Sequence, residues 1–328
     1  MSAIYKLIVV GAVAGAALLR ADLALSQGNT YPDKPIRMLV AFPAGGPTDV
    51  NARLFAQYMG ERLGQPVVVE NRPGAGGNVA STMAANAPKD GYTLLYNTSS
   101  FLLGALAYKS ATHNPMKDFV PVVRTVGVPL VIAVHPKVAA KSIQEFVVLT
   151  KSKPGTMNYA SSGAGTIDHL AFAMLESRLG MKLTHVPYKG TAPALTDLVG
   201  GQTDTFMTTL NTVLPFLQSK QLTALAVGSK VRTSLLPTIP TVAEATGIPD
   251  IELTAWNGIV APVGVPKEIV KRLNTVVNEA IKDPVFLKKL EASGAEPYGG
   301  SPEDYGRFLA SEQVSLAKSL REAGIEKQ

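Results

Sequence analysis

The sequence predicts an α/β protein made of two lobes, each built on a doubly wound sheet. Short apolar runs alternate with amphipathic stretches of helical length, which is typical of βαβ units and parallel sheets. This alternation occurs twice along the chain, and the second series begins with the apolar run at 130–134. The chain has 328 residues, whereas a single hydrophobic core rarely serves more than ~250 residues. Two lobes with separate cores are therefore expected.

The first series begins with a predicted strand at 36–42. Apolar residues at helical spacing follow it and predict a helix that ends at Gly64. A short buried strand is expected at 67–69, and Asn78 is expected to cap the next helix. A Lys-Asp-Gly turn then leads into a strand at 92–96. These elements form one doubly wound half.

The second series has the same organisation. Ser142 and Glu145 form a capping-box pattern that predicts a helix start, because each side chain can accept the other residue's backbone N–H. Helix-sized segments separate the predicted strands, which lie at 130–134, 157–160, 184–186, 204–207 and 222–227.

The C-terminal part predicts helices only. After an extended stretch at 251–261, helices are expected to begin near Pro266, Pro284 and Ser301. A helical tail without its own sheet should pack on the first lobe, so the chain crosses between lobes twice, near 121–130 and 251–261. Two crossings make a hinge. The lobe boundaries are then residues 27–128 with 255–328 for lobe 1, and residues 129–254 for lobe 2.

Residues 1–26 have the features of a secretory signal peptide. Lys6 supplies a positive charge, and the apolar run at 7–19 is too short to span a bilayer but long enough for a signal core. Small residues precede Gln27, so cleavage is expected before it. The alternative is an uncleaved anchor, because Arg20 lies between the apolar run and the expected cleavage site.

The composition excludes several functions. The chain contains no cysteine, which excludes disulfides, lipid anchors on cysteine, thiolate metal sites and cysteine nucleophiles. Loss of Lys6, Arg20 and Asp22 with the signal lowers the formal net charge from +6 to +5. This positive balance favours small anions only weakly, because salt screens it. No basic run with interleaved aromatic residues occurs, so no nucleic acid partner is expected.

A glycine-rich turn with the sequence FPAGGPTD, at 42–49, joins the first strand to the first helix. Open α/β sheets bind ligands at strand carboxyl ends, where helix N-termini offer free N–H groups and a partial positive charge. Gly45 and Gly46 allow the backbone to approach a ligand closely. The spacing matches neither the dinucleotide fingerprint nor a P-loop. The alternative is a plain tight turn, in which Asp49 only caps the helix.

Three further polar loops follow predicted strands or precede predicted helices, at 97–100, 161–166 and 188–191. The loop at 161–166 (SSGAGT) offers hydroxyl and N–H donors without a charged side chain. Each loop alone is weak evidence, but together they predict two anion cradles that face each other. Lys189 and Arg124 are candidates for neutralising a ligand charge, although most such side chains are solvated.

No catalytic centre, cofactor site or metal site is predicted. The chain has no nucleophile elbow and no HExxH helix, and its four histidines lack metal-ligand spacing. Ser162, Asp168 and His169 lie too close on one helical turn to form a nucleophile, base and orienter in series. We therefore expect a binding protein and not an enzyme.

Six segments together carry a specific resemblance. They are YPDKPIRMLVAFPAGGPTD at 31–49, GQPVVVENRPGAGGN at 64–78, KDGYTLL at 89–95, NYASSGAGT at 158–166, HVPYKGTAPALTDLVGGQTD at 185–204 and LPTIPTVAEA at 236–245. In this order they resemble the Bug (Bordetella uptake gene) family, the extracytoplasmic solute receptors of tripartite tricarboxylate transporters. The resemblance covers essentially the whole chain after the signal segment.

The resemblance implies the type II periplasmic-binding-protein architecture, with a deep cleft that closes around its ligand. Family ligands are typically tricarboxylic, dicarboxylic and aromatic acids, with some acidic amino acids and nicotinate-like compounds. The chain would then be a periplasmic monomer that passes a small organic carboxylate to a membrane permease of one large and one small subunit. The alternative is a receptor that presents its ligand to a membrane sensor kinase.

The resemblance also implies a set of ligand-binding residues. Family members hold one carboxylate through main-chain amides and ordered waters on two loops, which match 42–49 and 161–166 here. By the same mapping, residues 99 and 190–191 face the cleft, with 205 and 208 nearby. The implied set is Phe42, Ala44, Gly45, Gly46, Thr48, Asp49, Ser99, Ser161, Ser162, Gly165, Thr166, Gly190, Thr191, Asp204, Thr205 and Thr208.

The loop at 204–211 bears on the ligand class. Relatives that bind acidic amino acids place a carboxylate or equivalent acceptor near this loop to meet an ammonium group. Here the loop is rich in hydroxyls and otherwise apolar, and Asp204 ends a family-wide Gly-Gly-Gln-Thr-Asp run in which a structural role is the alternative. We therefore expect an organic acid without an amino group.

Overall fold

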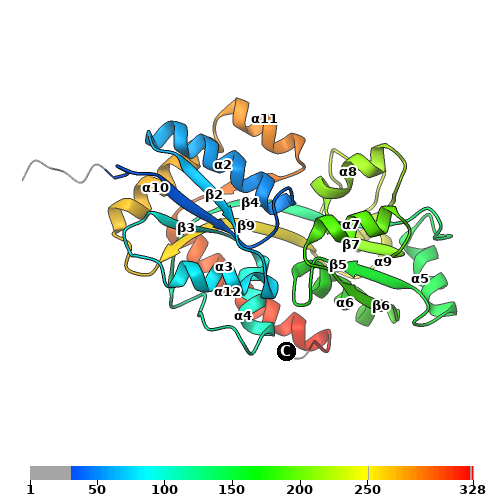
Figure 1. The fold of residues 1–328 in the computed structure, drawn as a ribbon. Helices are drawn as coiled ribbons and strands as arrows, with labels where there is room; N and C mark the ends of the chain where they lie inside the picture. The colour runs from blue at the N-terminus through cyan, green and yellow to red at the C-terminus, as the bar shows by residue number, and fades with distance from the viewer. Residues whose placement is uncertain (1–30, 250, 326, 328) are drawn as a thin grey trace, which may run out of the picture.

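The computed structural model describes residues 31–249, 251–325 and 327. The proposed signal segment, residues 1–26, lies outside the described residues. Two lobes lie side by side and are joined by long strands that pass between them (Figure 1). The α/β fold class predicted from the sequence is confirmed, although both sheets are mixed and not purely parallel.

The sheet of lobe 1 combines a parallel and an antiparallel half. Strand β1 lies between β2 and β3 and is parallel to both, as expected for a doubly wound unit. Strands β9 and β4 then continue the sheet in antiparallel fashion, and β10 pairs with β4. The strands are β1 (Ile36–Val40), β2 (Val67–Asn71), β3 (Thr93–Thr98), β4 (Phe119–Val134), β9 (Thr254–Pro262) and β10 (Glu296–Gly299).

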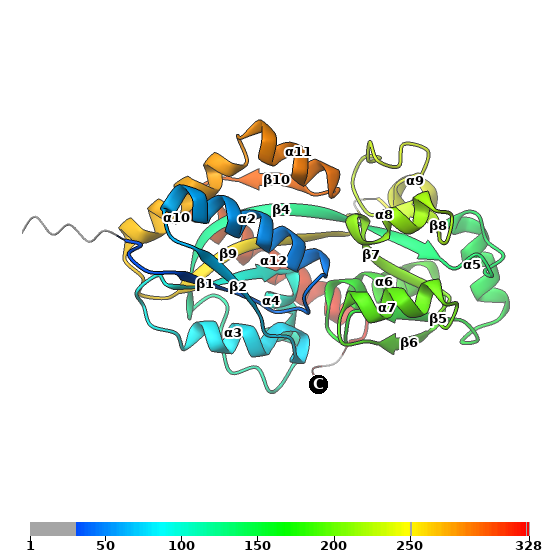
Figure 2. The same cartoon turned by 45° about the horizontal axis from the view of Figure 1, so that its top comes forward.

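Helices cover both faces of this sheet (Figure 2). They come from the first series and from the C-terminal tail, so the tail packs on lobe 1 as expected. They are α2 (Pro47–Leu63), the 3₁₀ turn η1 (Ala75–Gly77), α3 (Asn78–Ala85), α4 (Ser99–Ala107), α10 (Lys267–Ala280), α11 (Pro284–Ala292) and α12 (Pro302–Glu322).

Lobe 2 repeats the arrangement on a smaller scale. Strand β5 lies between β6 and β7 and is parallel to both, whereas β7 and β8 pair antiparallel with the end of β4. Its strands are β5 (Asn158–Ser161), β6 (Thr184–Pro187), β7 (Thr205–Thr209) and β8 (Thr223–Val227). Its helices are α5 (Ile143–Ser152), α6 (Ile167–Leu179), α7 (Thr191–Val199), α8 (Leu210–Gln218) and α9 (Val242–Thr246).

Strand β4 belongs to both sheets. It pairs with β9 as far as Pro129 and with β7 from Leu130 onward. At this crossing Leu130 N donates to Leu253 O (3.0 Å), and Gly228 N donates to Leu130 O (2.7 Å). The two segments that connect the lobes are therefore hydrogen-bonded to each other where one sheet ends and the other begins.

Two features of the hinge and tail differ from the expectations. Strand β4 begins at Phe119, although only 130–134 was expected as a strand, and a register shift beside Pro121 lets the ladder tolerate this proline. The tail also contains β10, although only helices were expected there. Its Tyr298 covers Gly127, where an added Cβ would lie 2.5 Å from the ring, so packing and not local pattern creates this strand.

The helix starts agree with the sequence in part. Ser301 forms a capping box with Asp304, and Pro284 is the first residue of α11. Ser142 accepts a hydrogen bond from Glu145 N (3.2 Å), but the Glu145 carboxylate accepts from Lys141 N instead of Ser142 N. The reciprocal box expected at Ser142 is therefore only half formed.

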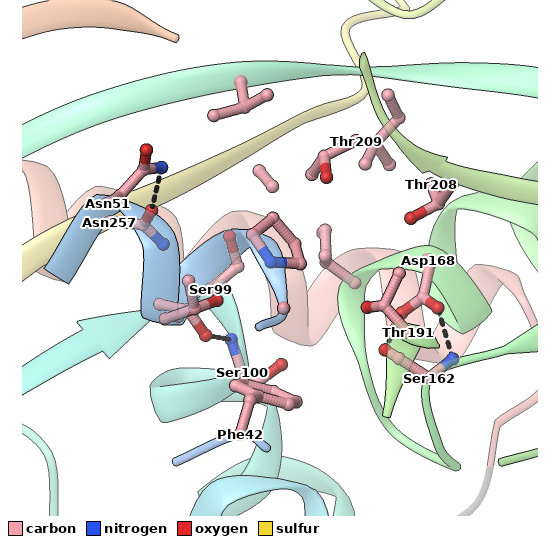
Figure 3. Close-up of a pocket in the computed structure, with 18 of the residues that line it drawn as sticks. Phe42, Asn51, Ser99, Ser100, Ser162, Asp168, Thr191, Thr208, Thr209 and Asn257 are labelled. Atoms are coloured by element: carbon pink, nitrogen blue, oxygen red, sulfur yellow. Dashed lines mark hydrogen bonds between the residues drawn. The ribbon is translucent and has the colours of Figure 1, made fainter. Parts of the chain in front are cut away.

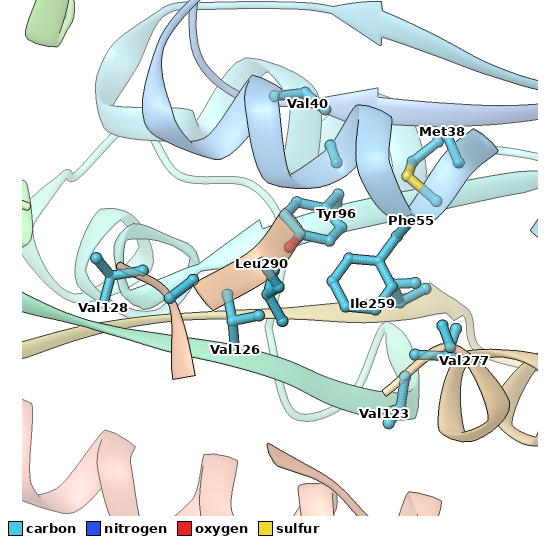
Figure 4. Close-up of a cluster of buried hydrophobic side chains, with 14 of the residues drawn as sticks. Met38, Val40, Phe55, Tyr96, Val123, Val126, Val128, Ile259, Val277 and Leu290 are labelled. Atoms are coloured by element: carbon cyan, nitrogen blue, oxygen red, sulfur yellow. The ribbon is translucent and has the colours of Figure 1, made fainter. Parts of the chain in front are cut away.

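The main core ties α2 to the hinge strands (Figure 4). Phe55 of α2 meets Phe286 of α11 edge-on, with ring centroids 4.9 Å apart. Tyr96 of β3 is fully buried, and its hydroxyl lies 3.1 Å from Thr125 Oγ1 of β4. This packing fixes the start of α2 relative to the point where the two lobes meet.

Gly258 of β9 packs tightly against helix α12. A Cβ at this position would lie 2.2 Å from the hydroxyl of Tyr305, a fully buried side chain that donates to Asn97 Oδ1 (2.9 Å). Gly258→Ala should therefore lower the free energy of unfolding by about 1–3 kcal/mol, measured by chemical denaturation.

Gly306 provides the matched control. It lies inside α12, and its Cβ would meet only Pro121 at 3.5 Å, an ordinary contact. Gly306→Ala should leave stability unchanged or raise it by up to about 1 kcal/mol, because alanine favours helix. Equal stabilities for Gly258→Ala and the wild type would contradict this account of the hinge.

Candidate ligand-binding site

A cavity of about 60 Å³ lies between the lobes, at the carboxyl ends of β1, β3, β5 and β7. Figure 3 shows Phe42, Ser99 and Ser100 of lobe 1 facing Ser162 and Thr208 of lobe 2 across it. Lobe 1 lines it with Phe42, Pro43, Gly46, Pro47, Thr48, Asn51, Thr98, Ser99 and Ser100, and lobe 2 with Ser162, Ile167, Asp168, Thr191, Ala192, Thr208 and Thr209. The hinge strands add Val128, Leu130, Ala255 and Asn257.

The structure brings one part of the predicted residue set to this cavity. All four predicted loops contribute, and the first glycine-rich turn and the Ser161–Ser162 turn meet at the same hollow. The predicted residues that line it are Phe42, Gly46, Thr48, Ser99, Ser162, Thr191 and Thr208.

Other predicted residues shape the first turn from outside the lining. The Asp49 carboxylate accepts from Gly45 N (2.9 Å) and from Asn71 Nδ2 (2.9 Å), and it forms an ion pair with Arg53. Its pKa stays below the usual value, because these hydrogen bonds outweigh the effect of burial. Asp49 thus holds the turn, while Ala44 and Gly45 lie exposed beside it.

The second turn is held in a similar way. Ser161 Oγ lies 2.6 Å from His185 Nε2 and accepts from Gly163 N (3.2 Å). Thr166 Oγ1 donates to Gly163 O (2.6 Å), and Gly165 N donates to His169 Nδ1 (3.1 Å). Ser161, Gly165 and Thr166 therefore build the loop and do not line the cavity. Gly190 likewise lies outside the lining and donates through its N–H to the carbonyl of residue 162.

Asp204 and Thr205 lie at the far end of β7 from the cavity. Asp204 accepts from Asn158 N (2.8 Å) and forms a 3.1 Å ion pair with Lys137. Thr205 Oγ1 donates to Ala133 O (2.9 Å). The cavity is reached only at Thr208, about 10 Å along the strand. Asp204 thus links β5, β7 and the segment after β4, and neither Asp204 nor Thr205 lines the cavity.

Two asparagines of the lining were not anticipated. Asn51 Nδ2 of α2 donates to Asn257 Oδ1 of β9 (3.3 Å), and Asn257 Nδ2 donates to Trp256 O (3.0 Å). Asn51 lies three residues after Thr48, so helical spacing alone would have placed both on one face. No local signal marks Asn257, because its position depends on how β9 crosses the hinge.

Four helices begin at this cavity without a side-chain cap. Helices α2, α6, α7 and α8 each lack a hydrogen bond from a capping side chain to their first turn. Their first-turn N–H groups remain available, and each helix adds a partial positive charge at this end. The hydroxyls of Thr48, Thr191 and Thr208 also make no hydrogen bond to the described part of the chain.

None of the described residues that line the cavity is basic. Asp168 is the only ionisable residue among those that line the cavity, and its carboxylate accepts from Ser162 N (2.5 Å) and Ser162 Oγ (2.8 Å). Burial raises the pKa of Asp168. Neither Lys189 nor Arg124, the two basic candidates from the sequence, lines this cavity. An anion here would be held by neutral N–H and O–H donors.

The lobes also touch at the mouth of the cavity. Tyr108 Oη, after α4, donates to Ala164 O in lobe 2 (2.7 Å). Gly190 packs against Pro43 across the gap, where an added Cβ would lie 3.0 Å from the proline ring. The two lobes are therefore in direct contact beside the cavity.

A pair of stacked histidines lies behind the second turn. The rings of His169 and His185 are nearly parallel, with centroids 4.0 Å apart, and Tyr159 stacks beside them. Burial lowers the pKa of His185 to about 4, and burial together with the neighbouring His185 lowers the pKa of His169 to about 4. Both rings are therefore neutral at pH 7 and belong to the scaffold of lobe 2.

The described residues hold no cluster of three or more metal-ligating side chains. In the same part of the chain, no helix is both long and apolar enough to cross a membrane. Ser162 donates its hydroxyl to the Asp168 carboxylate, and within the described chain it makes no hydrogen bond to a histidine.

Comparison with known proteins agrees with this geometry. The model of the tripartite tricarboxylate transporter family receptors matches residues 51–324. The fold and the interlobe cavity define a two-lobed solute-binding protein. The chain belongs to the family of tripartite tricarboxylate transporter receptors, whose members are solute-binding receptors and not enzymes.

Three solved structures illustrate the relationship. The Rhodopseudomonas palustris protein Rpa4515, solved with adipate, is 35% identical with a TM-score of 0.87, covering 90% of this chain and 99% of that one. The periplasmic binding protein BugD is 36% identical with a TM-score of 0.86, covering 91% and 100%. MatC from Rhodopseudomonas palustris, with bound malate, is 31% identical with a TM-score of 0.83, covering 88% and 100%.

The histidine pair predicts a pH dependence of stability. In the unfolded chain these side chains titrate near 6.5, whereas in the folded protein they titrate near 4. Between these values the unfolded state binds protons that the folded state does not, so stability should fall as the pH falls from 6.5 towards 4. Chemical denaturation at several pH values should show this loss. It should be smaller in the His169→Gln/His185→Gln double variant, and an equal loss in that variant would contradict this explanation.

The contact at the mouth predicts an effect on affinity. Tyr108→Phe removes a hydrogen bond made only when the lobes are closed, so the dissociation constant for a bound acid should rise by a few fold to about tenfold. Calorimetry measures this change. Tyr92→Phe is the control, because the Tyr92 hydroxyl donates to Asp33 Oδ1 within lobe 1 (2.6 Å). Equal affinities for Tyr108→Phe and the wild type would show that this contact does not stabilise closure.

Proposed function

We propose that this protein captures a small organic carboxylate between its lobes and delivers it to a tripartite tricarboxylate transporter. One observation carries the proposal: uncapped helix starts and unpaired hydroxyls from both lobes converge on one cavity. Free N–H groups at helix N-termini bind anions, and a ligand held by both lobes stabilises the closed form.

The proposed contacts follow from this geometry. The start of α2, with Gly46 and Thr48, faces the ligand from lobe 1, together with Ser99. Ser162, Thr191 and Thr208 face it from lobe 2. The remaining residues of the predicted set support these loops or lie at the far end of β7.

We propose a dicarboxylate or another acid without an amino group. Rpa4515 was solved with adipate and MatC with malate, and both share this fold at more than 30% identity. An ammonium group would need an acceptor in the cavity. The only carboxylate in the lining is that of Asp168, which already accepts two hydrogen bonds from Ser162.

We further propose that the mature protein acts as a periplasmic monomer. The apolar segment within residues 1–26 supports export, and BugD is described as a periplasmic binding protein. The receptor family supports a membrane permease with a large and a small subunit as the partner.

Calorimetry against a panel of malate, succinate, adipate, citrate and benzoate tests the proposal. One-site binding to at least one acid is expected. Thr48→Ala and Thr191→Ala should each cost about 1 kcal/mol of binding free energy, because each removes one donor from one lobe.

Thr196→Ala is the matched control for these two variants. This threonine is an exposed residue of α7, and its hydroxyl donates to Ala192 O within the helix (3.1 Å). Its affinity should equal that of the wild type. The proposal fails if no acid of the panel binds, or if the Thr48 and Thr191 variants bind as tightly as the control.

A further inference from the structure

A second hollow, which we call the rear groove, lies on the other side of strand β9 from the cavity. Successive side chains of a strand point to opposite faces. Thr254 and Trp256 line the rear groove, whereas Ala255 and Asn257 line the cavity between the lobes. The rear groove has a volume of about 550 Å³, within the range of ~300–1,000 Å³ typical of small-molecule sites.

Both lobes contribute to the rear groove. Helix α6 and residues 251–253 of lobe 2 form one wall, and β4, β10 and α12 of lobe 1 form the other. Figures 1 and 2 show α12 running beneath the hinge strands towards α6. A molecule in this groove would therefore contact both lobes without entering the cavity.

Arg124 of β4 lies in the rear groove against two aromatic rings. Its guanidinium carbon is 3.6 Å from the ring centroid of Tyr298 and 3.8 Å from that of Phe308. Both rings thus contact the same guanidinium, one from β10 and one from α12. Cation–π contacts thus hold the plane of the group and leave its edge open.

The edge of this guanidinium has no protein partner. Arg124 Nε is buried and has no hydrogen bond. The two Nη groups are not among these buried unpaired atoms, and the described residues offer them no hydrogen bond or ion pair, so the Nη edge is the one that a ligand can reach. Leaving a buried donor unpaired is costly. A planar guanidinium with a free edge matches the two oxygens of a carboxylate.

The other charges of the rear groove are already engaged. Glu312 accepts from the indole Nε1 of Trp256 (2.9 Å), and Glu252 forms an ion pair with Lys230 (3.3 Å). Glu322 forms ion pairs with two basic residues of the wall, Arg178 (3.6 Å) and Lys318 (3.7 Å). Of the described residues that line the groove, four are basic and three are acidic. The groove therefore carries one net positive charge, because Glu322 is shared by two basic side chains and Glu312 lies near Arg124 without forming an ion pair.

We propose that the rear groove binds a small organic monocarboxylate, with the edge of Arg124 holding its two oxygens. A single negative charge balances the groove, whereas a phosphate dianion would bring excess charge close to the acidic side chains of the wall. This site is separate from the cavity between the lobes and does not depend on the ligand proposed there.

The single tryptophan of the chain makes the test specific. Trp256 lines the rear groove, so its fluorescence and its indole N–H resonance report on this site. Titration of the full-length protein with acetate, butyrate and hexanoate should give a saturable response to at least one acid. Arg124→Met should weaken that response about tenfold or more, because it removes a charged, two-point contact.

Three further variants make the result decisive. Arg124→Lys keeps the charge but loses the planar edge, so binding should weaken several fold. Arg307→Met, a control on α12 outside the groove lining, should bind as the wild type does. The Thr48→Ala/Thr191→Ala double variant should also retain the response, because it alters only the cavity between the lobes.

Several outcomes would overturn the proposal. One is the absence of a saturable response to all three acids, and another is equal affinity for Arg124→Met and wild type. A response lost in the Thr48→Ala/Thr191→Ala double variant would assign the signal to the cavity between the lobes. Trp256 is linked to that cavity because its backbone N–H donates to Ser99 Oγ (3.2 Å). Thermal unfolding of each variant confirms that it is folded.

Discussion

The hydrogen-bonded crossing of the two segments that join the lobes is the constraint on which the rest of the structure depends. Strand β4 pairs with β9 on one side of this point and with β7 and β8 on the other. Leu130, Gly228 and Leu253 link the crossing segments through their backbones. Because both sheets begin at this crossing, the carboxyl ends of β1 and β3 face those of β5 and β7. The cavity is a direct result of that orientation.

Recognition by neutral donors follows from how the helices begin. Helices α2, α6, α7 and α8 leave their first N–H groups uncapped at the cavity. An isolated buried cation would carry a large desolvation cost, whereas backbone dipoles are held in place by the fold at no such cost. Acidic side chains are confined to support: Asp49 holds the first turn, and Asp168 holds the second. The lining can therefore favour an anion without a basic residue.

Much of this organisation could be predicted from the sequence, because its signals are local. Glycines and hydroxyls placed directly after apolar runs mark the four loops, and two of those loops contain the unpaired hydroxyls of Thr48 and Thr191. The signals fail where tertiary packing decides. Asn257 reaches the cavity because β9 crosses the hinge, and β10 forms because Tyr298 covers Gly127. The sequence does not show which turn residues line the cavity and which support the turn. That division depends on which hydroxyls form hydrogen bonds within the folded loops.

Strand β9 serves two recognition surfaces with one backbone. Its odd-numbered residues from 255 to 257 face the cavity, and its even-numbered residues from 254 to 256 face the rear groove. Insertion or deletion of a single residue would exchange the two faces over the length of the strand. Surface loops elsewhere in the chain tolerate changes of length, but this segment can evolve only by substitution. A change in the length of β9 would therefore alter the cavity and the rear groove at the same time.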